Sequence, residues 1–139
     1  APPWQRGDVV MHEAVAARMT QPTRTEPTGT AAEAARLARS ASMVVTSRYH
    51  PAVFAGPSGV ATLGIAVDDY TTVKLSGALA AFGQASVVAA ADLADAPQLA
   101  ERLWGARHEI RVRGQVIAAE RRAESDAWWD RVVGVVSNT

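Results

Sequence analysis

Short apolar segments alternate with helical segments along this chain, and this order constrains the fold more than any other feature. Three segments lack the apolar–polar alternation of half-exposed strands, namely 42–47, 60–67 and 85–90. Strands that are apolar on both sides are typical of parallel sheets covered by helices on both faces. The order predicts an α/β domain, with a parallel sheet of about three strands flanked by helices and joined by right-handed crossovers.

Capping residues and apolar stripes mark the helices before and between these strands. Asp8 is expected to cap a helix over 8–19. Thr30 and Glu33 predict a capping box at the start of a helix over 31–41. The apolar face of that second helix is expected to comprise Ala34, Leu37, Ala38 and Ala41. The remaining expectations are a loop over 20–29, a short helix over 51–55 that has Pro51 in its first turn, and a helix over 72–82 that ends at Gly83.

The last third of the chain has helical rather than strand periodicity, so a helical C-terminal segment over 96–139 is expected to follow an α/β part over 1–95. Gly105 and Gly114 are expected to break this segment into two or three helices. Three of the four tryptophans lie here, Trp104, Trp128 and Trp129. Core packing is the expected role of these side chains, and the alternative is an exposed apolar face that awaits another domain or subunit.

Size and composition exclude several classes of protein. The 139 residues suffice for one domain. A formal net charge of zero argues against a nucleic-acid arm or a polybasic membrane patch, and the absence of cysteine excludes disulfide scaffolds and thiol chemistry. No apolar run is long enough for a membrane span, and no signal peptide is recognised, so a cytoplasmic location is expected. Because a sheet of three strands is thin, we expect the single domain 1–139 to be the C-terminal half of a longer protein.

The first candidate site follows the first expected strand. Ligands of open parallel sheets bind outside the carboxyl ends of the strands. Arg48 and His50 lie there beside Ser47, and in extended geometry their side chains would point the same way. A guanidinium, an imidazole and the N–H groups of a helix start together predict a site for phosphate or carboxylate, with His50 able to donate a proton. The alternative is that Arg48 pairs with Asp68 or Asp69 and that His50 only caps a helix.

The second candidate segment follows the next strand and contains Tyr70 and Lys74. Their spacing of four residues puts both on one helical face if the helix has begun by Tyr70. Thirteen of the fourteen basic residues are arginine, so the single lysine indicates a required ammonium group. Lys74 could supply a point charge for a phosphate. The alternative is a surface lysine on a helix capped by Asp69 or Thr72.

Other residues and motifs give weaker evidence for a functional site. Two adjacent carboxylates, Asp68 and Asp69, are poor evidence for a metal site without further ligands, and no metal is expected. His12 and His108 lack partners at the spacing of metal ligands. Neither a phosphate-binding loop with its lysine nor the glycine pattern of dinucleotide-binding folds occurs.

Three blocks of sequence, in this order and spacing, resemble the C-terminal region of polysaccharide pyruvyl transferases. The blocks are Ser47–Ala55 with its R-x-H motif, the strand Gly59–Ile65, and Tyr70–Lys74 before a helix. Ala61 stands where the family often has proline. The resemblance covers residues 31–83.

The resemblance implies an enzyme of two Rossmann-like halves, similar to GT-B glycosyltransferases, that moves pyruvyl from phosphoenolpyruvate onto a sugar diol as a ketal. Arg48 and His50 would contact phosphoenolpyruvate as catalytic residues, and Ser47, Tyr70 and Lys74 would complete the donor site. No cofactor is implied. A saccharide acceptor and a separate N-terminal domain would be the partners, the isolated chain would be inactive, and it could form a homo-oligomer.

Two other functions remain open at this point. The chain could be the donor half of a GT-B-like glycosyltransferase or sugar epimerase, which would hold a nucleoside diphosphate at the same strand ends. That class usually adds a carboxylate for the ribose hydroxyls, and 59–74 contains no glutamate. The chain could also be a non-catalytic subunit-interaction domain, for which the tryptophan-rich tail argues.

Overall fold

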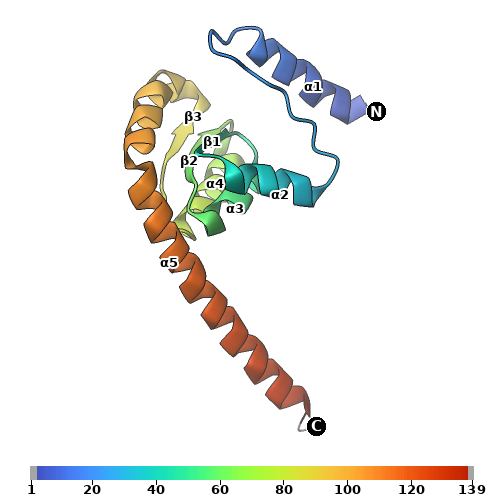
Figure 1. Cartoon of the computed structure of the whole chain (residues 1–139), viewed down its shortest axis with the longest axis vertical. Helices are drawn as coiled ribbons and strands as arrows, with labels where there is room; N and C mark the ends of the chain where they lie inside the picture. The colour runs from blue at the N-terminus through green and yellow to red at the C-terminus, as the bar shows by residue number, and fades with distance from the viewer. Residues whose placement is uncertain (1–2, 138–139) are drawn as a thin grey trace.

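A parallel sheet of three strands forms the centre of the chain, in a computed structural model that describes residues 3–137 and the side chains of 9–137. The strands β1 (Met43–Thr46), β2 (Ala61–Ala66) and β3 (Val87–Ala89) lie in the order β1-β2-β3. Thr46 pairs with Gly64, and Ala66 pairs with Ala89. The predicted α/β fold with its three parallel strands and helical C-terminal segment is therefore confirmed (Figure 1).

Helices cover both faces of the sheet. Residues of β2 that point to one face, Ala61 and Leu63, pack with Leu103 and Ile110 of α5 (Ala96–Ser137). The opposite face carries α3 (Tyr49–Ala55) and α4 (Asp69–Ala80), and α2 (Ala31–Ser40) packs beside α3. Because α3 and α4 lie on the same face and the strands follow in one direction, the two crossovers have the same hand. Two short 3-10 segments, η1 (Gly56–Ser58) and η2 (Ala90–Asp95), lead into β2 and α5.

The amino-terminal helices show how local signals set the helix starts. Thr30 Oγ1 accepts a hydrogen bond from the Glu33 backbone N–H at 3.2 Å, and Glu33 Oε2 accepts one from the Thr30 N–H at 3.0 Å. The predicted capping box of α2 is therefore confirmed. The cap predicted at Asp8 is wrong, because α1 (Pro3–Ala16) begins five residues earlier. A proline suits the first position of a helix, where its missing N–H has no partner to lose.

The C-terminal segment is one helix of 42 residues, so the predicted breaks at Gly105 and Gly114 are wrong. A single glycine costs a helix about 1 kcal/mol, which the surrounding alanine, leucine, arginine and glutamate residues and tertiary packing outweigh. Gly114 has a packing role instead. A Cβ placed on it would lie 2.6 Å from Gly59 Cα, so α5 crosses the backbone before β2 at a point where no side chain fits. Gly59 itself has a φ of 62°, in the left-handed region that favours glycine.

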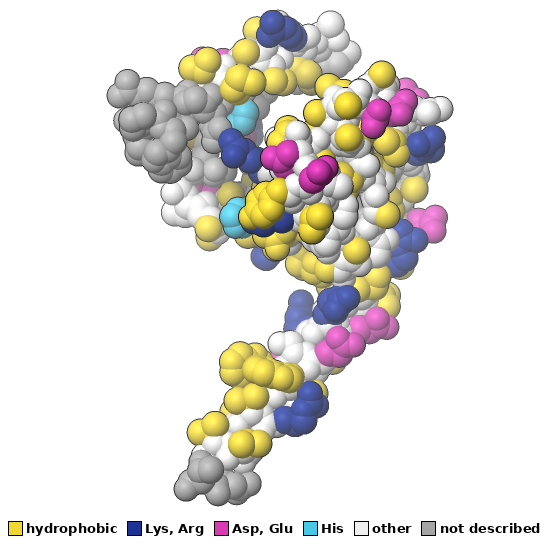
Figure 2. All heavy atoms as spheres, turned by 180° about the vertical axis from the view of Figure 1, so that it is seen from behind, with side chains coloured by type: hydrophobic (Ala, Val, Ile, Leu, Met, Phe, Trp, Pro, Cys, Tyr) yellow, Lys and Arg dark blue, Asp and Glu magenta, His cyan; other side chains and the backbone are white. Residues whose placement is uncertain are grey.

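The tryptophans of α5 do not pack in the core, so that expectation is wrong. Trp104 and Trp128 are each 50% exposed and Trp129 is 57% exposed. The guanidinium of Arg107 lies 4.2 Å from the ring centroid of Trp104. The rings of Trp128 and Trp129 meet edge to face, with their centroids 4.7 Å apart. Figure 2 shows apolar side chains on the protruding end of α5, where the sheet no longer covers the helix.

We predict that Gly114→Ala destabilises the fold by about 1–3 kcal/mol, because the added methyl group meets backbone atoms that cannot move aside cheaply. Gly105→Ala is the matched control, since it lies in the same helix with nothing within 4 Å of the added Cβ. That control should gain up to about 1 kcal/mol from helix propensity. Urea unfolding measures both variants, and equal stability changes would contradict the packing role of Gly114.

Candidate functional site

The turn between β1 and α3 is fixed by Thr46 at the carboxyl end of β1. Its buried hydroxyl accepts a hydrogen bond from the Arg48 N–H at 2.9 Å and donates one to the Arg48 carbonyl at 3.0 Å. This turn makes Arg48 the N-cap residue, so α3 begins at Tyr49 rather than at Pro51 as predicted. His50 therefore lies in the first helical turn, so the extended geometry expected from Arg48 to His50 is wrong.

The turn between β2 and α4 is fixed by Asp68. Its carboxylate accepts a hydrogen bond from the Thr71 N–H at 2.7 Å, and its carbonyl accepts one from the Thr72 hydroxyl at 3.0 Å. The cap is thus Asp68, whereas the sequence favoured Asp69 or Thr72. Hydrogen bonds from the Thr71 side chain and backbone lower the pKa of Asp68. The Asp68 carboxylate therefore satisfies one of the backbone N–H groups at the amino end of α4.

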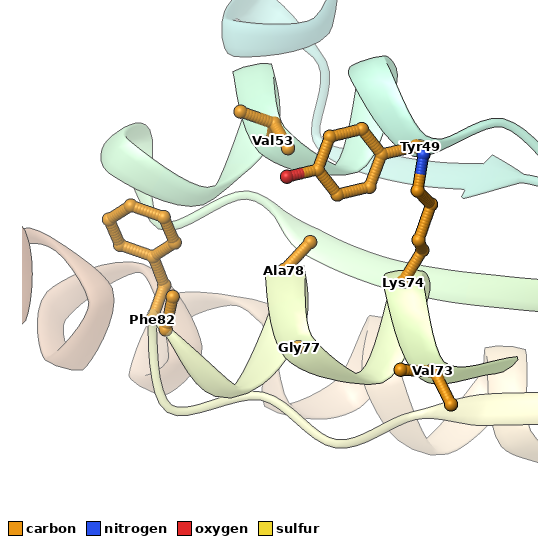
Figure 3. Close-up of a pocket in the computed structure, with 8 residues that line it drawn as sticks. Tyr49, Val53, Val73, Lys74, Gly77, Ala78 and Phe82 are labelled. Atoms are coloured by element: carbon orange, nitrogen blue, oxygen red, sulfur yellow. The ribbon is translucent and has the colours of Figure 1, made fainter. Parts of the chain in front are cut away.

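Lys74 lies between two phenol rings at this edge of the sheet. Because α4 begins at Asp69, Tyr70 and Lys74 share a helical face, as their spacing predicts, and Lys74 Nζ lies 4.6 Å from the Tyr70 ring centroid. Tyr49 of α3 contributes the second ring, at 5.3 Å. Figure 3 shows Lys74 and Tyr49 reaching toward each other from the two helices. Cation–π contacts of this kind hold an ammonium group in place while leaving it partly open to solvent.

The surroundings of Lys74 keep it charged. A hydrogen bond with the Tyr70 side chain raises the pKa of Lys74, and Tyr70 and Tyr49 add to this only in alkali, where their phenols become negatively charged. An ammonium group that keeps its proton at neutral pH can attract a phosphate or a carboxylate.

Tyr49 is the residue that the sequence interpretation missed. It stands between Arg48 and His50, and its ring also meets the His50 ring edge to face at 5.5 Å between centroids. His50 in turn lies 6.1 Å from the Phe54 ring. The sequence could have indicated Tyr49 only through its position in the first turn of a helix beside α4. That position could not be recognised without knowing where α3 begins.

The candidate residues thus divide into two groups at the carboxyl edge of the sheet. His50, Tyr49, Lys74 and Tyr70 form a continuous row of ring and cation contacts. Ser47 and Arg48 have exposed side chains on the segment that leads into this row. Within the part of the chain that the structure describes, no three His, Asp or Glu side chains gather as a metal site would require.

A groove of about 450 Å³ begins at Tyr49 and Lys74 and runs between α3 and α4 (Figure 3). Its other lining residues are apolar or small, namely Val53, Val73, Gly77, Ala78, Ala81 and Phe82. A Cβ added to Gly77 would have nothing within 4 Å, so the groove is open at that point. An apolar groove with a cation at one end can accept a molecule that carries both an anionic and an apolar part.

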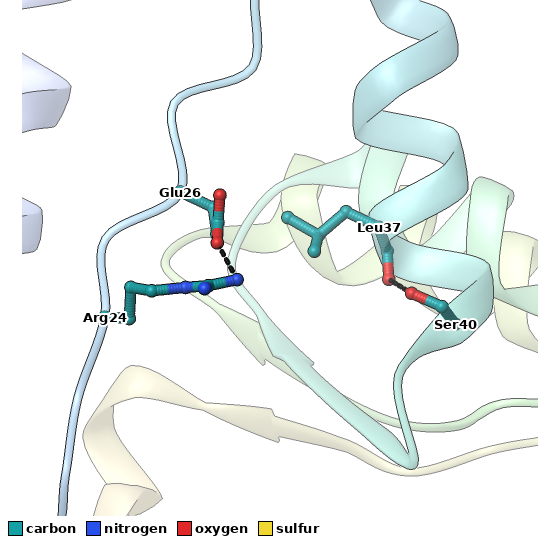
Figure 4. Close-up of polar contacts among 4 residues, drawn as sticks. All are labelled: Arg24, Glu26, Leu37 and Ser40. Carbon is teal, nitrogen blue, oxygen red and sulfur yellow. Dashed lines mark hydrogen bonds and ion pairs between the residues drawn. The ribbon is translucent and has the colours of Figure 1, made fainter.

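A second hollow, of about 430 Å³, lies between the end of α1, the extended segment 20–29 and α2. Arg24 and Glu26 form an ion pair on the extended segment, and the Leu37 side chain of α2 points toward it (Figure 4). Leu37 is 44% exposed, although it belongs to the predicted apolar face of α2 together with the buried Ala38. Ala35 and Ala38 are the buried residues of this helix. His12 lines this hollow, whereas the residues of the candidate donor site, Ser47, Arg48, His50, Tyr70 and Lys74, do not.

Comparisons with known proteins identified no relative of this chain. No protein-family description, curated protein or solved structure matches it. Among the described residues, no helix is both long enough and apolar enough to cross a membrane.

We predict that Asp68→Ala lowers the thermal midpoint of unfolding at neutral pH, because Thr71 loses its hydrogen-bond acceptor. Folding lowers the pKa of Asp68, so its stabilisation is present above the pKa of an unfolded aspartate, about 4, and is lost as the pH falls through the folded-state pKa. The gap between variant and parent should therefore shrink in acid. Asp69→Ala, which removes the adjacent carboxylate, is the control and should change the midpoint less.

Proposed function

We propose that this chain is the donor-binding domain of a polysaccharide pyruvyl transferase. The observation that carries the proposal is the meeting of two strand-end segments at one edge of the sheet. The R-x-H segment follows β1, the Y-x-x-x-K segment follows β2, and Tyr49 and Lys74 bring them into contact. The same segments carry the resemblance in sequence, and ligands of parallel sheets bind at this edge.

The side chains at this edge suit phosphoenolpyruvate, which carries a phosphate and a carboxylate. Arg48 offers a planar fork of donors that either group can accept. Lys74 adds a positive charge held by two rings. Ser47 and Tyr70 carry hydroxyl groups on the same two segments and complete the donor site.

The proposed reaction uses His50 as the acid. His50 gives a proton to the methylene carbon of the enol, which becomes a methyl group, and C2 becomes electrophilic; the proton of the first attacking hydroxyl returns to His50. One sugar hydroxyl attacks C2, the bond from C2 to the phosphate oxygen breaks, and inorganic phosphate leaves. A second hydroxyl then closes the ketal, and its proton is lost to solvent. Arg48 and Lys74 stabilise the negative charge on the leaving phosphate.

The acceptor contacts belong to a second domain in this proposal. The described edge offers cations and rings for the donor, and the groove beside it is mostly apolar. We therefore expect the chain alone to bind phosphoenolpyruvate but to transfer no pyruvyl group. The proposed place of the reaction is the cytoplasm, where phosphoenolpyruvate is found.

We predict that phosphoenolpyruvate raises the thermal stability of the chain and that Arg48→Ala or His50→Ala removes the effect. A ligand at about 100 times its dissociation constant adds about 2.7 kcal/mol to the free energy of unfolding. Thermal melting with phosphoenolpyruvate, inorganic phosphate, UDP and UDP-sugars measures this. Arg102→Ala is the matched control, because Arg102 is exposed on α5.

The same experiment discriminates the alternatives. A shift with UDP or a UDP-sugar, but not with phosphoenolpyruvate, would replace the proposal with a glycosyltransferase-like donor site. A phosphoenolpyruvate shift that survives in Arg48→Ala and His50→Ala would show that the donor binds elsewhere.

A further inference from the structure

The groove between α3 and α4 is bounded by an aromatic ring near each end. Near the amino end of α3, Tyr49 reaches across the groove, and its hydroxyl points toward Val53 and Ala78 (Figure 3). Just beyond the carboxyl ends of α3 and α4, the Phe82 ring packs against Gly56 so closely that a Cβ on Gly56 would overlap it. The groove is therefore a site of fixed length rather than a channel that runs on along the helices.

The size of the groove selects a narrow ligand. Its floor is made by small residues of α4, Gly77, Ala78 and Ala81. Lys74 and Phe82 are eight residues apart, so the groove is about 12 Å long. Over this length a helix, about 10–12 Å across with its side chains, would need roughly twice the 450 Å³ of the groove, so a helical partner does not fit. An extended aliphatic chain of roughly eight to ten carbon atoms spans the same length.

Charge complementarity selects an anionic head group for that chain. Among the described residues that line the groove, Lys74 is the charged one. Its ammonium group is held beside the rings of Tyr70 and Tyr49, and its side chain is exposed, so a carboxylate can reach it without leaving water entirely. Arg121 lies at the other end, where its Nε donates a hydrogen bond to the Ala81 carbonyl, but it does not line the groove. The head group of a ligand is therefore expected at the Lys74 end and its apolar chain toward Phe82.

We propose that the groove between α3 and α4 binds a medium-chain aliphatic carboxylate. The carboxylate lies at Lys74, and the chain covers Gly77, Ala78 and Ala81 beneath the Tyr49 ring. Burial of the chain drives binding, and each buried CH₂ group tightens it about fourfold. The proposal does not depend on the function proposed above, because phosphoenolpyruvate has no apolar chain and its binding is measured separately.

Isothermal titration calorimetry with acetate, octanoate and decanoate tests the apolar part of the site. Decanoate should bind one molecule per chain with a dissociation constant below about 1 mM. Octanoate should bind about tenfold more weakly, since it buries two fewer CH₂ groups. Acetate should show no measurable binding. A chain that binds no decanoate, or that binds octanoate as tightly as decanoate, would overturn the proposal.

A variant that fills the groove tests where the ligand binds. Gly77→Leu puts a side chain into the open space above α4 and should weaken decanoate binding about tenfold or more. Leucine also favours a helix more than glycine does, so this variant should stay folded, which circular dichroism checks. Gly105→Leu makes the same change in α5, where nothing lies within 4 Å of the added Cβ, and should bind like the parent. Equal binding by Gly77→Leu and the parent would show that decanoate binds elsewhere.

Reversal of the charge tests the head-group end. The parent should prefer decanoate to decyltrimethylammonium, and Lys74→Glu should lose or reverse this preference, because an exposed ion pair becomes a like-charge contact. Arg102→Glu is the matched control, since Arg102 is an exposed cation on α5, and it should keep the preference of the parent. If Lys74→Glu still prefers decanoate as strongly as the parent does, Lys74 does not hold the carboxylate and the proposal is wrong.

Discussion

The contact between Gly59 and Gly114 is the constraint on which the rest of the structure depends. A helix backbone and a turn backbone meet there with no room for a Cβ on either residue. This contact lays α5 across the sheet so that Leu103 and Ile110 reach β2 and β3. It also holds the turn that leads into β2, the central strand, whose residues from Ala61 to Gly64 are all buried. The position of β2 in turn decides where β1 and α4 lie.

The candidate donor site follows from how the strands end. Thr46, the last residue of β1, pairs with Gly64 of β2, so the chain leaves both strands at the same edge and enters α3 and α4 side by side. Gly64 brings α4 close to the sheet, because a Cβ there would lie 3.2 Å from the Leu75 side chain. With both helices seated in this way, Tyr49 and Lys74 come within reach of each other. The cation of the site is therefore placed by apolar packing beneath it rather than by ion pairs.

Sequence reasoning succeeded where a signal is local. The Thr30–Glu33 capping box, the three apolar strands and the shared face of Tyr70 and Lys74 all depend on residues within a few positions of one another. It failed where contacts between residues far apart in the sequence determine the structure. From the local sequence Gly114 resembles a helix breaker, and its packing role is visible only in its contact with Gly59. Tyr49 resembles an exposed surface residue, and its role is visible only in its contact with Lys74 of α4. The exposure of Trp128 depends on where the sheet ends under α5, which no pattern within α5 encodes.

The end of α5, residues 119–137, poses a separate physical question, because the first turn of an isolated helix is costly to form in water. Here the costly first turns are already formed where Leu103 and Ile110 pack on the sheet, so this end only has to extend an existing helix one residue at a time. Its alanine, glutamate and arginine residues suit that extension. Helicity alone therefore implies no partner for this end. The side chains of Trp128 and Val135 do not follow from helicity either, because helix extension requires no tryptophan or valine on an exposed face.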